Sequence, residues 1–153
     1  MLATPNKFAL VGATAEGCTE LNAFDKCLLA SGIGNLNLLR VSSILPPNTK
    51  LVEKLEIPPG SLTPTAYGYI TSRVPGEIIS AAVAVGINSE DSYGVIMEYS
   101  GKCTLTEAEA TIRRMVEEAF AVRGIPLNKI LVKAVEHKVE KCGCAFAAVP
   151  LWY

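Results

Sequence analysis

The chain has 153 residues, of which half are hydrophobic and 19% are charged, so it can bury one core and is not a disordered chain. Its 14 basic and 15 acidic residues give a formal net charge of −1. There is no run of like charge, which excludes the electrostatic footprint of a nucleic-acid or membrane-surface binder. We expect a single domain, residues 1–153.

The cysteine content and the N-terminal composition predict a cytoplasmic protein. The number of cysteines, five, is odd, and the N-terminal residues lack the basic and apolar regions of a signal peptide. The longest apolar stretch, about residues 78–87, has roughly half the length needed to cross a bilayer. Cys142 and Cys144 form a CxC motif without the further ligands of a zinc site, so we expect no metal.

The first part of the chain predicts a strand, a helix and a second strand. Residues 7–13 are a short apolar run typical of a strand. Thr19 is a suitable N-cap for the helical spacing of apolar residues that follows, and Gly32 a suitable stop. Residues 35–45 are rich in branched side chains and end at two prolines, which predicts one strand before a sharp break. Residues 48–63 predict an exposed connection.

The rest of the chain predicts one helix and five strands. Thr104 and Glu107 form a capping box before an apolar stripe that ends at Gly124. Residues 77–87 are apolar on both faces, so this strand should be central and covered on both sides. With about two helices and six or seven strands, we predict a mixed α/β or α+β sandwich with a mainly antiparallel sheet. The predicted strands are 66–73, 77–87, 93–99, 129–139 and 142–152.

Two features could indicate chemistry, but their surroundings favour structural roles. Residues 32–35, Gly-Ile-Gly-Asn, lack a full GxGxxG or P-loop motif and follow a helix, so they predict a tight turn from helix to strand. His137 is the only histidine, and no nucleophile-elbow motif accompanies it. A structural histidine is therefore favoured over a hydrolase triad.

Glu98 is the acidic residue with the most unusual surroundings. It lies in the apolar run 94–99, on the strand face shared by Gly94 and Ile96. Burial on that face would disfavour the charged carboxylate, which suits a general acid near neutral pH. The alternative is an edge strand with Glu98 facing water. The Ser42-Ser43 pair lies at a strand end and by itself indicates nothing.

Short motifs in a fixed order cover nearly the whole chain. They are LNAFD (21–25), GIGNLN (32–37), RVSSI (40–44), PTAYGYI (64–70), VPGE (74–77), IMEY (96–99), CAFA (144–147) and LWY (151–153). In this combination the sequence resembles the pyruvoyl-dependent arginine decarboxylase family. Their joint occurrence is far more specific than any single motif.

The resemblance implies a four-layer αββα sandwich and a proenzyme that cuts itself between Ser42 and Ser43. The products would be a β chain, residues 1–42, and an α chain, residues 43–153. The Ser43 hydroxyl would attack the Ser42 carbonyl to give an ester. Elimination and loss of ammonia would then leave a covalent pyruvoyl group at residue 43, and a strained strand end could favour this attack by proximity.

The resemblance also implies the reaction and the roles of the site residues. The pyruvoyl ketone would form a Schiff base with L-arginine and accept the electrons released with carbon dioxide, giving agmatine without pyridoxal phosphate or a metal. Glu98 matches the residue that protonates the carbanion, and Asn37 matches an asparagine that supports processing and the active centre. Asp25 matches the acid that pairs with the substrate guanidinium.

The spacing of Asn37 and Ser43 bears on assembly. In one extended strand, six steps of about 3.3 Å separate the two side chains by roughly 20 Å, so they could serve one site only across subunits. This fits the trimers and hexamers of cleaved protomers that the resemblance implies. Two alternatives stay open: a pyruvoyl decarboxylase for another amino acid, and an uncleaved, inactive family member that acts as a binding or regulatory protein.

Overall fold

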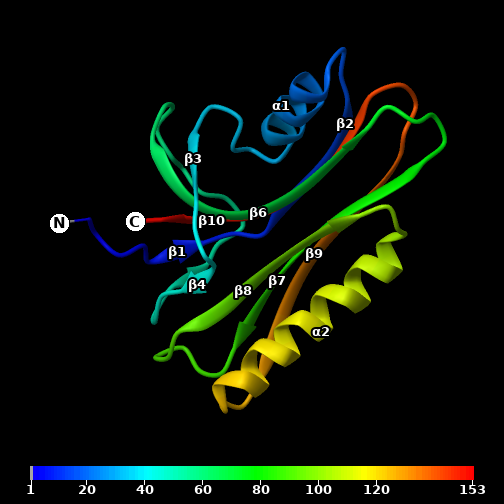
Figure 1. Ribbon diagram of the computed structural model, residues 1–153. Coiled ribbons are helices and arrows are strands. Elements are labelled where there is room, and N and C mark those ends of the chain that lie inside the picture. Colours follow the sequence, from blue (N-terminus) through cyan, green and yellow to red (C-terminus); the bar gives the residue numbers. More distant parts are fainter. Residues whose placement is uncertain (1) are drawn as a thin grey trace.

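Two helices and ten strands are formed by residues 2–153, the part of the chain that the computed structural model describes (Figure 1). The helices are α1 (Glu20–Ala30) and α2 (Leu105–Arg123). The strands are β1 (Lys7–Phe8), β2 (Val11–Glu16), β3 (Asn37–Arg40), β4 (Ile44–Leu45), β5 (Lys50–Leu51), β6 (Leu62–Ser72), β7 (Ile78–Ile87), β8 (Gly94–Gly101), β9 (Lys129–Lys138) and β10 (Gly143–Trp152).

The strands form two sheets packed face to face. One has the order β3-β6-β10-β1-β5, with β2 also paired to β10, and the other has the order β4-β8-β7-β9. The pairs β3–β6 and β1–β5 are parallel and the others are antiparallel. Helix α1 covers the outer face of the first sheet and α2 that of the second (Figure 1). The expected αββα sandwich with mainly antiparallel sheets is confirmed.

Strand β7 is the centre of the second sheet, as its two apolar faces predict. It pairs with β8 on one side and β9 on the other. Val83 and Val85 pack into the core between the sheets, whereas Ala82 and Ala84 face α2. All four side chains are fully buried, because a layer covers each face of the strand.

The predicted helix ends are confirmed by their hydrogen bonds. Thr19 accepts a bond from the backbone N–H of Asn22, and Thr104 and Glu107 form the reciprocal capping box. Gly124 closes α2 with a φ of 65°, and Gly32, just beyond α1, has a φ of 79°. Residues 32–35 are thus the tight turn from helix to strand that the glycines predict.

The prediction of one strand over residues 7–13 is wrong, because β1 and β2 are separate there. Both pair with β10 in one continuous register, with Phe8 opposite Leu151 and Val11 opposite Ala148. Pro150 lies between those partners. Since proline has no N–H to donate, the ladder loses a bond at this point and the strand is interrupted.

The prediction of one strand over residues 35–45 is also wrong. The segment forms β3 and β4, which belong to different sheets. The break falls at Ser43, whose φ of 82° is incompatible with a continuing strand. The connection 48–63 contains a further short strand, β5, which pairs with β1. These short strands raise the total above the six or seven expected.

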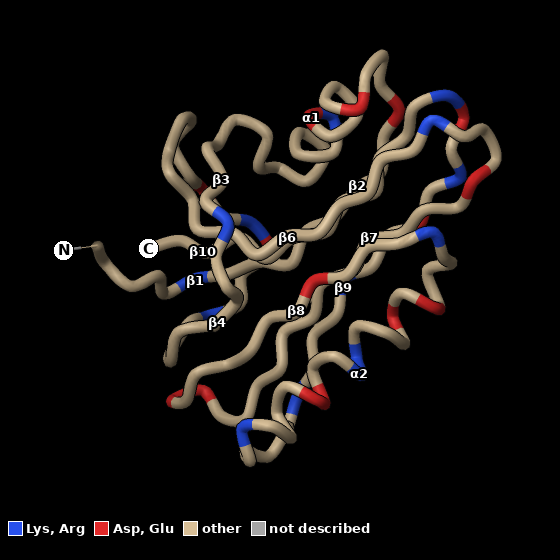
Figure 2. The backbone as a smooth tube through the Cα atoms, viewed as in Figure 1, with Lys and Arg blue, Asp and Glu red and all other residues tan. Residues whose placement is uncertain are grey.

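Charges of both signs are interspersed along the backbone (Figure 2), in accord with the net charge of −1. Within residues 2–153, neither helix combines the length and apolarity that crossing a bilayer requires. Ser43 lies between β3 and β4, which are edge strands of the two different sheets.

Candidate active site

Ser43 stands where the chain passes from one sheet to the other. Strand β3 pairs with β6 in the first sheet, and β4 pairs with β8 in the second. The backbone at Ser43 takes a left-handed φ of 82°, a conformation that costs a residue with a Cβ about 1–2 kcal/mol. The Ser43 carbonyl accepts a 2.8 Å bond from the Ile96 N–H, and only 6% of Ser43 is exposed. The surrounding strands hold this strained residue in place.

The Ser43 hydroxyl faces a carboxylate. Its Oγ lies 3.1 Å from Oε2 of Glu98, to which it donates, and 3.4 Å from the carbonyl oxygen of Val41. A carboxylate at this distance can accept the hydroxyl proton. The pair therefore consists of a nucleophile and a base within hydrogen-bonding reach, the arrangement that an activated serine requires.

Glu98 faces the space between the sheets, on the strand face predicted for it. Ile96, two residues earlier in β8, packs in the core between the sheets. A Cβ added at Gly68 of β6 would lie 3.4 Å from the Glu98 Cβ. Glu98 is only half-buried, and β4 pairs with β8 only at Gly94 and Val95, so this pairing does not extend to Glu98. Its carboxylate is thus within reach of both Ser43 and solvent.

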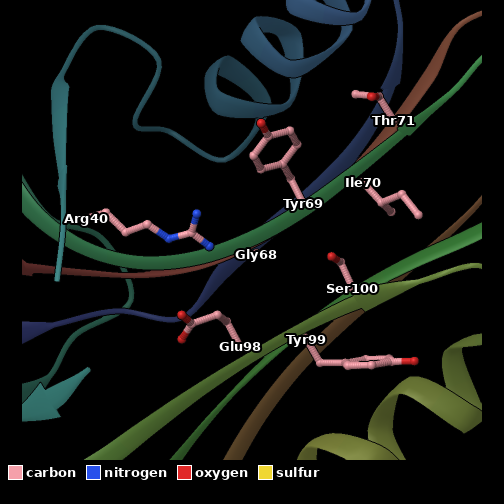
Figure 3. A pocket seen from close by; sticks show the side chains of 8 residues that line it. All are labelled: Arg40, Gly68, Tyr69, Ile70, Thr71, Glu98, Tyr99 and Ser100. Carbon is pink, nitrogen blue, oxygen red and sulfur yellow. The ribbon is translucent and has the colours of Figure 1, made fainter. Parts of the chain in front are cut away.

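A pocket of about 520 Å³ opens beside Glu98, between β6 and β8 (Figure 3). Strand β3 contributes one residue, β6 contributes four and β8 contributes three. Figure 3 shows the Glu98 carboxylate and the Arg40 guanidinium at the same end of this pocket. The lining residues are Arg40, Gly68, Tyr69, Ile70, Thr71, Glu98, Tyr99 and Ser100.

Asn37 and Asp25, the other predicted site residues, make no hydrogen bond to Ser43 within the described residues. Asn37 begins β3, is exposed, and donates from Nδ2 to the Gly60 carbonyl at 2.8 Å. Asp25 is exposed on α1, and neither residue lines the pocket beside Glu98. One turn away on either side of Asp25, Leu21 and Leu29 expose 74% and 51% of their surface. This face of α1 therefore combines a carboxylate with exposed apolar side chains.

The sequence reading missed Arg40. The residue belongs to the RVSSI motif, but nothing in its pattern assigned it a role. Its guanidinium donates from Nη2 to the Tyr67 carbonyl at 2.6 Å and lies over the Tyr67 ring, 4.6 Å from the centroid. Its position as a lone cation in an apolar segment, three residues before Ser43, is the one signal that could have drawn attention to it.

His137 has a structural partner, as the sequence analysis favoured. Its Nε2 lies 2.6 Å from Oε2 of Glu16. Although burial alone would raise the pKa of Glu16, bonds from the backbone N–H groups of Lys141 and Cys142 and from His137 lower that pKa to about 2. Glu16 thereby joins the end of β2 to β9 and to the β9–β10 turn.

Among residues 2–153, no three His, Cys, Asp or Glu side chains gather as a metal-ligand set. The five cysteines are free thiols, and those of the CxC motif, Cys142 and Cys144, are buried. The Cys27 thiol donates to the Cys144 carbonyl at 3.5 Å. The two thiols of this motif lie at the start of β10, a closely packed strand.

The chain is similar to a family of known proteins over almost its entire length. The family model for pyruvoyl-dependent arginine decarboxylase matches residues 7–153. A protein of that name from Methanocaldococcus jannaschii is 56% identical over 150 residues, covering 97% of this chain and 91% of its own. Proteins of the same name from Methanococcus maripaludis strain C5 and Pyrococcus abyssi are 48% and 47% identical, covering 97% of this chain and 92% and 96% of their own.

Proposed function

The chain belongs to the pyruvoyl-dependent arginine decarboxylase family of carboxy-lyases, and from this premise we propose that it cuts itself between Ser42 and Ser43 and then converts L-arginine to agmatine and carbon dioxide. The observation that carries the proposal is the 3.1 Å bond between the Ser43 hydroxyl and Glu98 at a left-handed backbone position. This contact supports the proposal, because a carboxylate that can accept a proton lies beside the hydroxyl proposed as the nucleophile.

In the self-cleavage, the Ser43 Oγ bonds to the Ser42 carbonyl carbon while the peptide C–N bond breaks. Glu98 accepts the hydroxyl proton and passes it to the nitrogen of Ser43, which is freed as an amine as the ester forms. Elimination then releases the Ser42 carboxylate, and one water molecule replaces the nitrogen, which leaves as ammonia. Because φ at Ser43 is a torsion that includes the Ser42 carbonyl carbon, cleavage also abolishes the strained torsion of about 1–2 kcal/mol.

The site fits a pyruvoyl group derived from Ser43. The residue is buried at a sheet edge, and its side chain points to a carboxylate that borders an open pocket. When formed, such a ketone condenses with a substrate amine and accepts electrons, so we propose that neither pyridoxal phosphate nor a metal is needed. Glu98, which faces both residue 43 and the pocket, then takes a proton from the solvent that reaches it and delivers it to the substrate carbon.

Asp25 is proposed to pair with the guanidinium of the substrate. A carboxylate offers this planar cation two parallel hydrogen bonds. Leu21 and Leu29, exposed on the same face of α1, provide the apolar surface that the methylene groups of arginine would cover. Another amino acid without a cationic side chain would leave Asp25 unpaired, which is unfavourable once it is shielded from water.

We further propose that the complete site forms between subunits of a trimer, singly or paired as a hexamer, with Asn37 supporting Ser43 from a neighbouring protomer. Asn37 and Ser43 lie on strands of different sheets, and Asn37 contacts Gly60 in its own chain. Leu39, Ile44 and Leu62 expose 47%, 42% and 62% of their surface near these residues. Such apolar exposure is typical of a surface that another protomer covers. The free thiols favour a reducing, cytoplasmic setting.

Incubation of the purified chain with arginine, lysine, ornithine, histidine and aspartate tests this function. We expect a denaturing gel to show chains 1–42 and 43–153, and carbon dioxide and agmatine to form from arginine. Reduction with borohydride in the presence of arginine should fix arginine or agmatine to chain 43–153 as a secondary amine, in which the amine nitrogen replaces the ketone oxygen. An uncleaved chain without decarboxylase activity would instead support a binding or regulatory protein. Release of carbon dioxide from another amino acid, and not from arginine, would identify that amino acid as the substrate.

A further inference from the structure

The pocket beside Glu98 contains one cation, Arg40, which the proposed reaction does not yet use. Of the eight residues that line the pocket, only Arg40 and Glu98 carry a charge. The two groups lie at the same end of the pocket (Figure 3). Among residues 2–153, no carboxylate lies within 4 Å of the Arg40 guanidinium. Although Glu98 borders the same pocket, the Arg40 guanidinium thus has no ion-pair partner within the described residues.

Arg40 is held in place on one side and free on the other. Tyr67 stacks against one face of the guanidinium at 4.6 Å and accepts a 2.6 Å bond from Nη2. This is the only hydrogen bond that Arg40 makes to the rest of residues 2–153 through its side chain. A guanidinium has five N–H donors, so most of its donors stay available. Stacking on an aromatic ring also reduces the entropy that a new partner would cost.

The position of Arg40 indicates which anion its guanidinium would bind. Glu98 touches the Ser43 hydroxyl on one side and borders the pocket with Arg40 on the other. If the substrate amine is joined to residue 43 and Glu98 protonates the adjacent carbon, the carboxylate on that carbon also lies in this pocket. A fixed guanidinium with free donors is the group best suited to bind it.

We propose, on the basis of the proposed function, that Arg40 binds the α-carboxylate of arginine and thereby distinguishes substrate from product. Agmatine keeps the guanidinium that Asp25 holds but has no carboxylate, so the contact with Arg40 ends when carbon dioxide leaves. The enzyme would then bind arginine more tightly than agmatine, and the reaction itself would weaken binding of the product. Because the carboxylate loses its charge as carbon dioxide forms, this contact stabilises bound arginine at least as much as the transition state, so its loss should raise KM without lowering kcat.

Arg40→Gln tests the proposal against Arg113→Gln, a matched change at an exposed position on α2. We expect Arg40→Gln to raise KM for arginine about ten- to hundredfold without lowering kcat, as loss of a charge-assisted pair implies. The inhibition constant of agmatine should stay within about twofold of wild type. Arg113→Gln should change neither constant.

Two outcomes for Arg40→Gln would overturn the proposal: an unchanged KM, or a fall in kcat. A second measurement needs no variant. Argininamide, whose amide carries no charge, should bind wild type about ten- to hundredfold more weakly than arginine, and equal binding would overturn the proposal even if Arg40→Gln fails to mature. If the wild type releases no carbon dioxide from arginine, the proposed function fails and the role of Arg40 falls with it. Normal turnover with unchanged KM in Arg40→Gln refutes the role of Arg40 alone.

Discussion

The hydroxyl of Ser43 and Oε2 of Glu98 lie 3.1 Å apart, although the two residues are 55 positions apart in the sequence. Ser43 precedes β4, and Glu98 lies in β8, which pairs with β4. The close approach follows from that pairing and from the left-handed φ of Ser43. This single contact brings together Ser43, whose peptide bond is proposed to be cut, and Glu98, the proton donor proposed for turnover.

Ser43→Ala should stay a single full-length chain on a denaturing gel, because the substitution removes the proposed nucleophile. Ser42→Ala is the matched control. It retains the carbonyl that is attacked and removes an exposed hydroxyl, so it should still give chains 1–42 and 43–153. Two fragments from Ser43→Ala would place the cleavage site elsewhere.

Glu98→Gln should lower kcat by about 10²- to 10⁴-fold, the usual contribution of a positioned proton donor. The amide keeps the size of the side chain and can still accept a bond from Ser43, so some chain should mature. The rate is measured per cleaved chain, counted by mass spectrometry, to separate turnover from maturation. A kcat near that of wild type in the cleaved fraction would mean that another group supplies the proton.

Asp25→Asn should mature normally and lose about ten- to hundredfold in kcat/KM for arginine, since a charge-assisted pair becomes a neutral hydrogen bond. Glu20→Gln, which also removes one negative charge from an exposed position of α1, is the control and should leave kcat/KM unchanged. Unaltered kinetics in Asp25→Asn would show that the substrate guanidinium binds elsewhere.

Glu16→Gln should lower the free energy of unfolding at pH 7 by about 1–2 kcal/mol, because the carboxylate accepts two backbone bonds and faces His137. The pKa of Glu16 falls from 4.5 to about 2 on folding, so the ionised form stabilises the fold above pH 4.5. This contribution should disappear as the pH falls from about 4.5 to 2.

Urea unfolding of wild type and Glu16→Gln across that pH range checks this prediction. The two curves should converge as the pH falls. Glu140→Gln, at an exposed position in the neighbouring turn, is the control and should follow the wild type. A difference between wild type and Glu16→Gln that is independent of pH would assign the role of Glu16 to packing alone.

Local patterns in the sequence determined the elements whose residues interact with near neighbours. The capping box of Thr104 and Glu107 predicted the start of α2, because its two bonds lie within one turn of helix. The apolar faces of β7 predicted its central place, since burial on both faces leaves no alternative for such a strand. The order of the short motifs also indicated the family, which the comparisons confirmed.

Tertiary structure alone decided how the segment 35–45 is divided and what surrounds Ser43. The segment is rich in branched residues that favour a strand, and only pairing with β6 on one side and β8 on the other splits it into β3 and β4. The Ser43–Glu98 bond and the stacking of Arg40 on Tyr67 depend on residues tens of positions apart. Local sequence propensity carries no information about contacts between residues so far apart in the chain, because these contacts form only when two sheets are packed together.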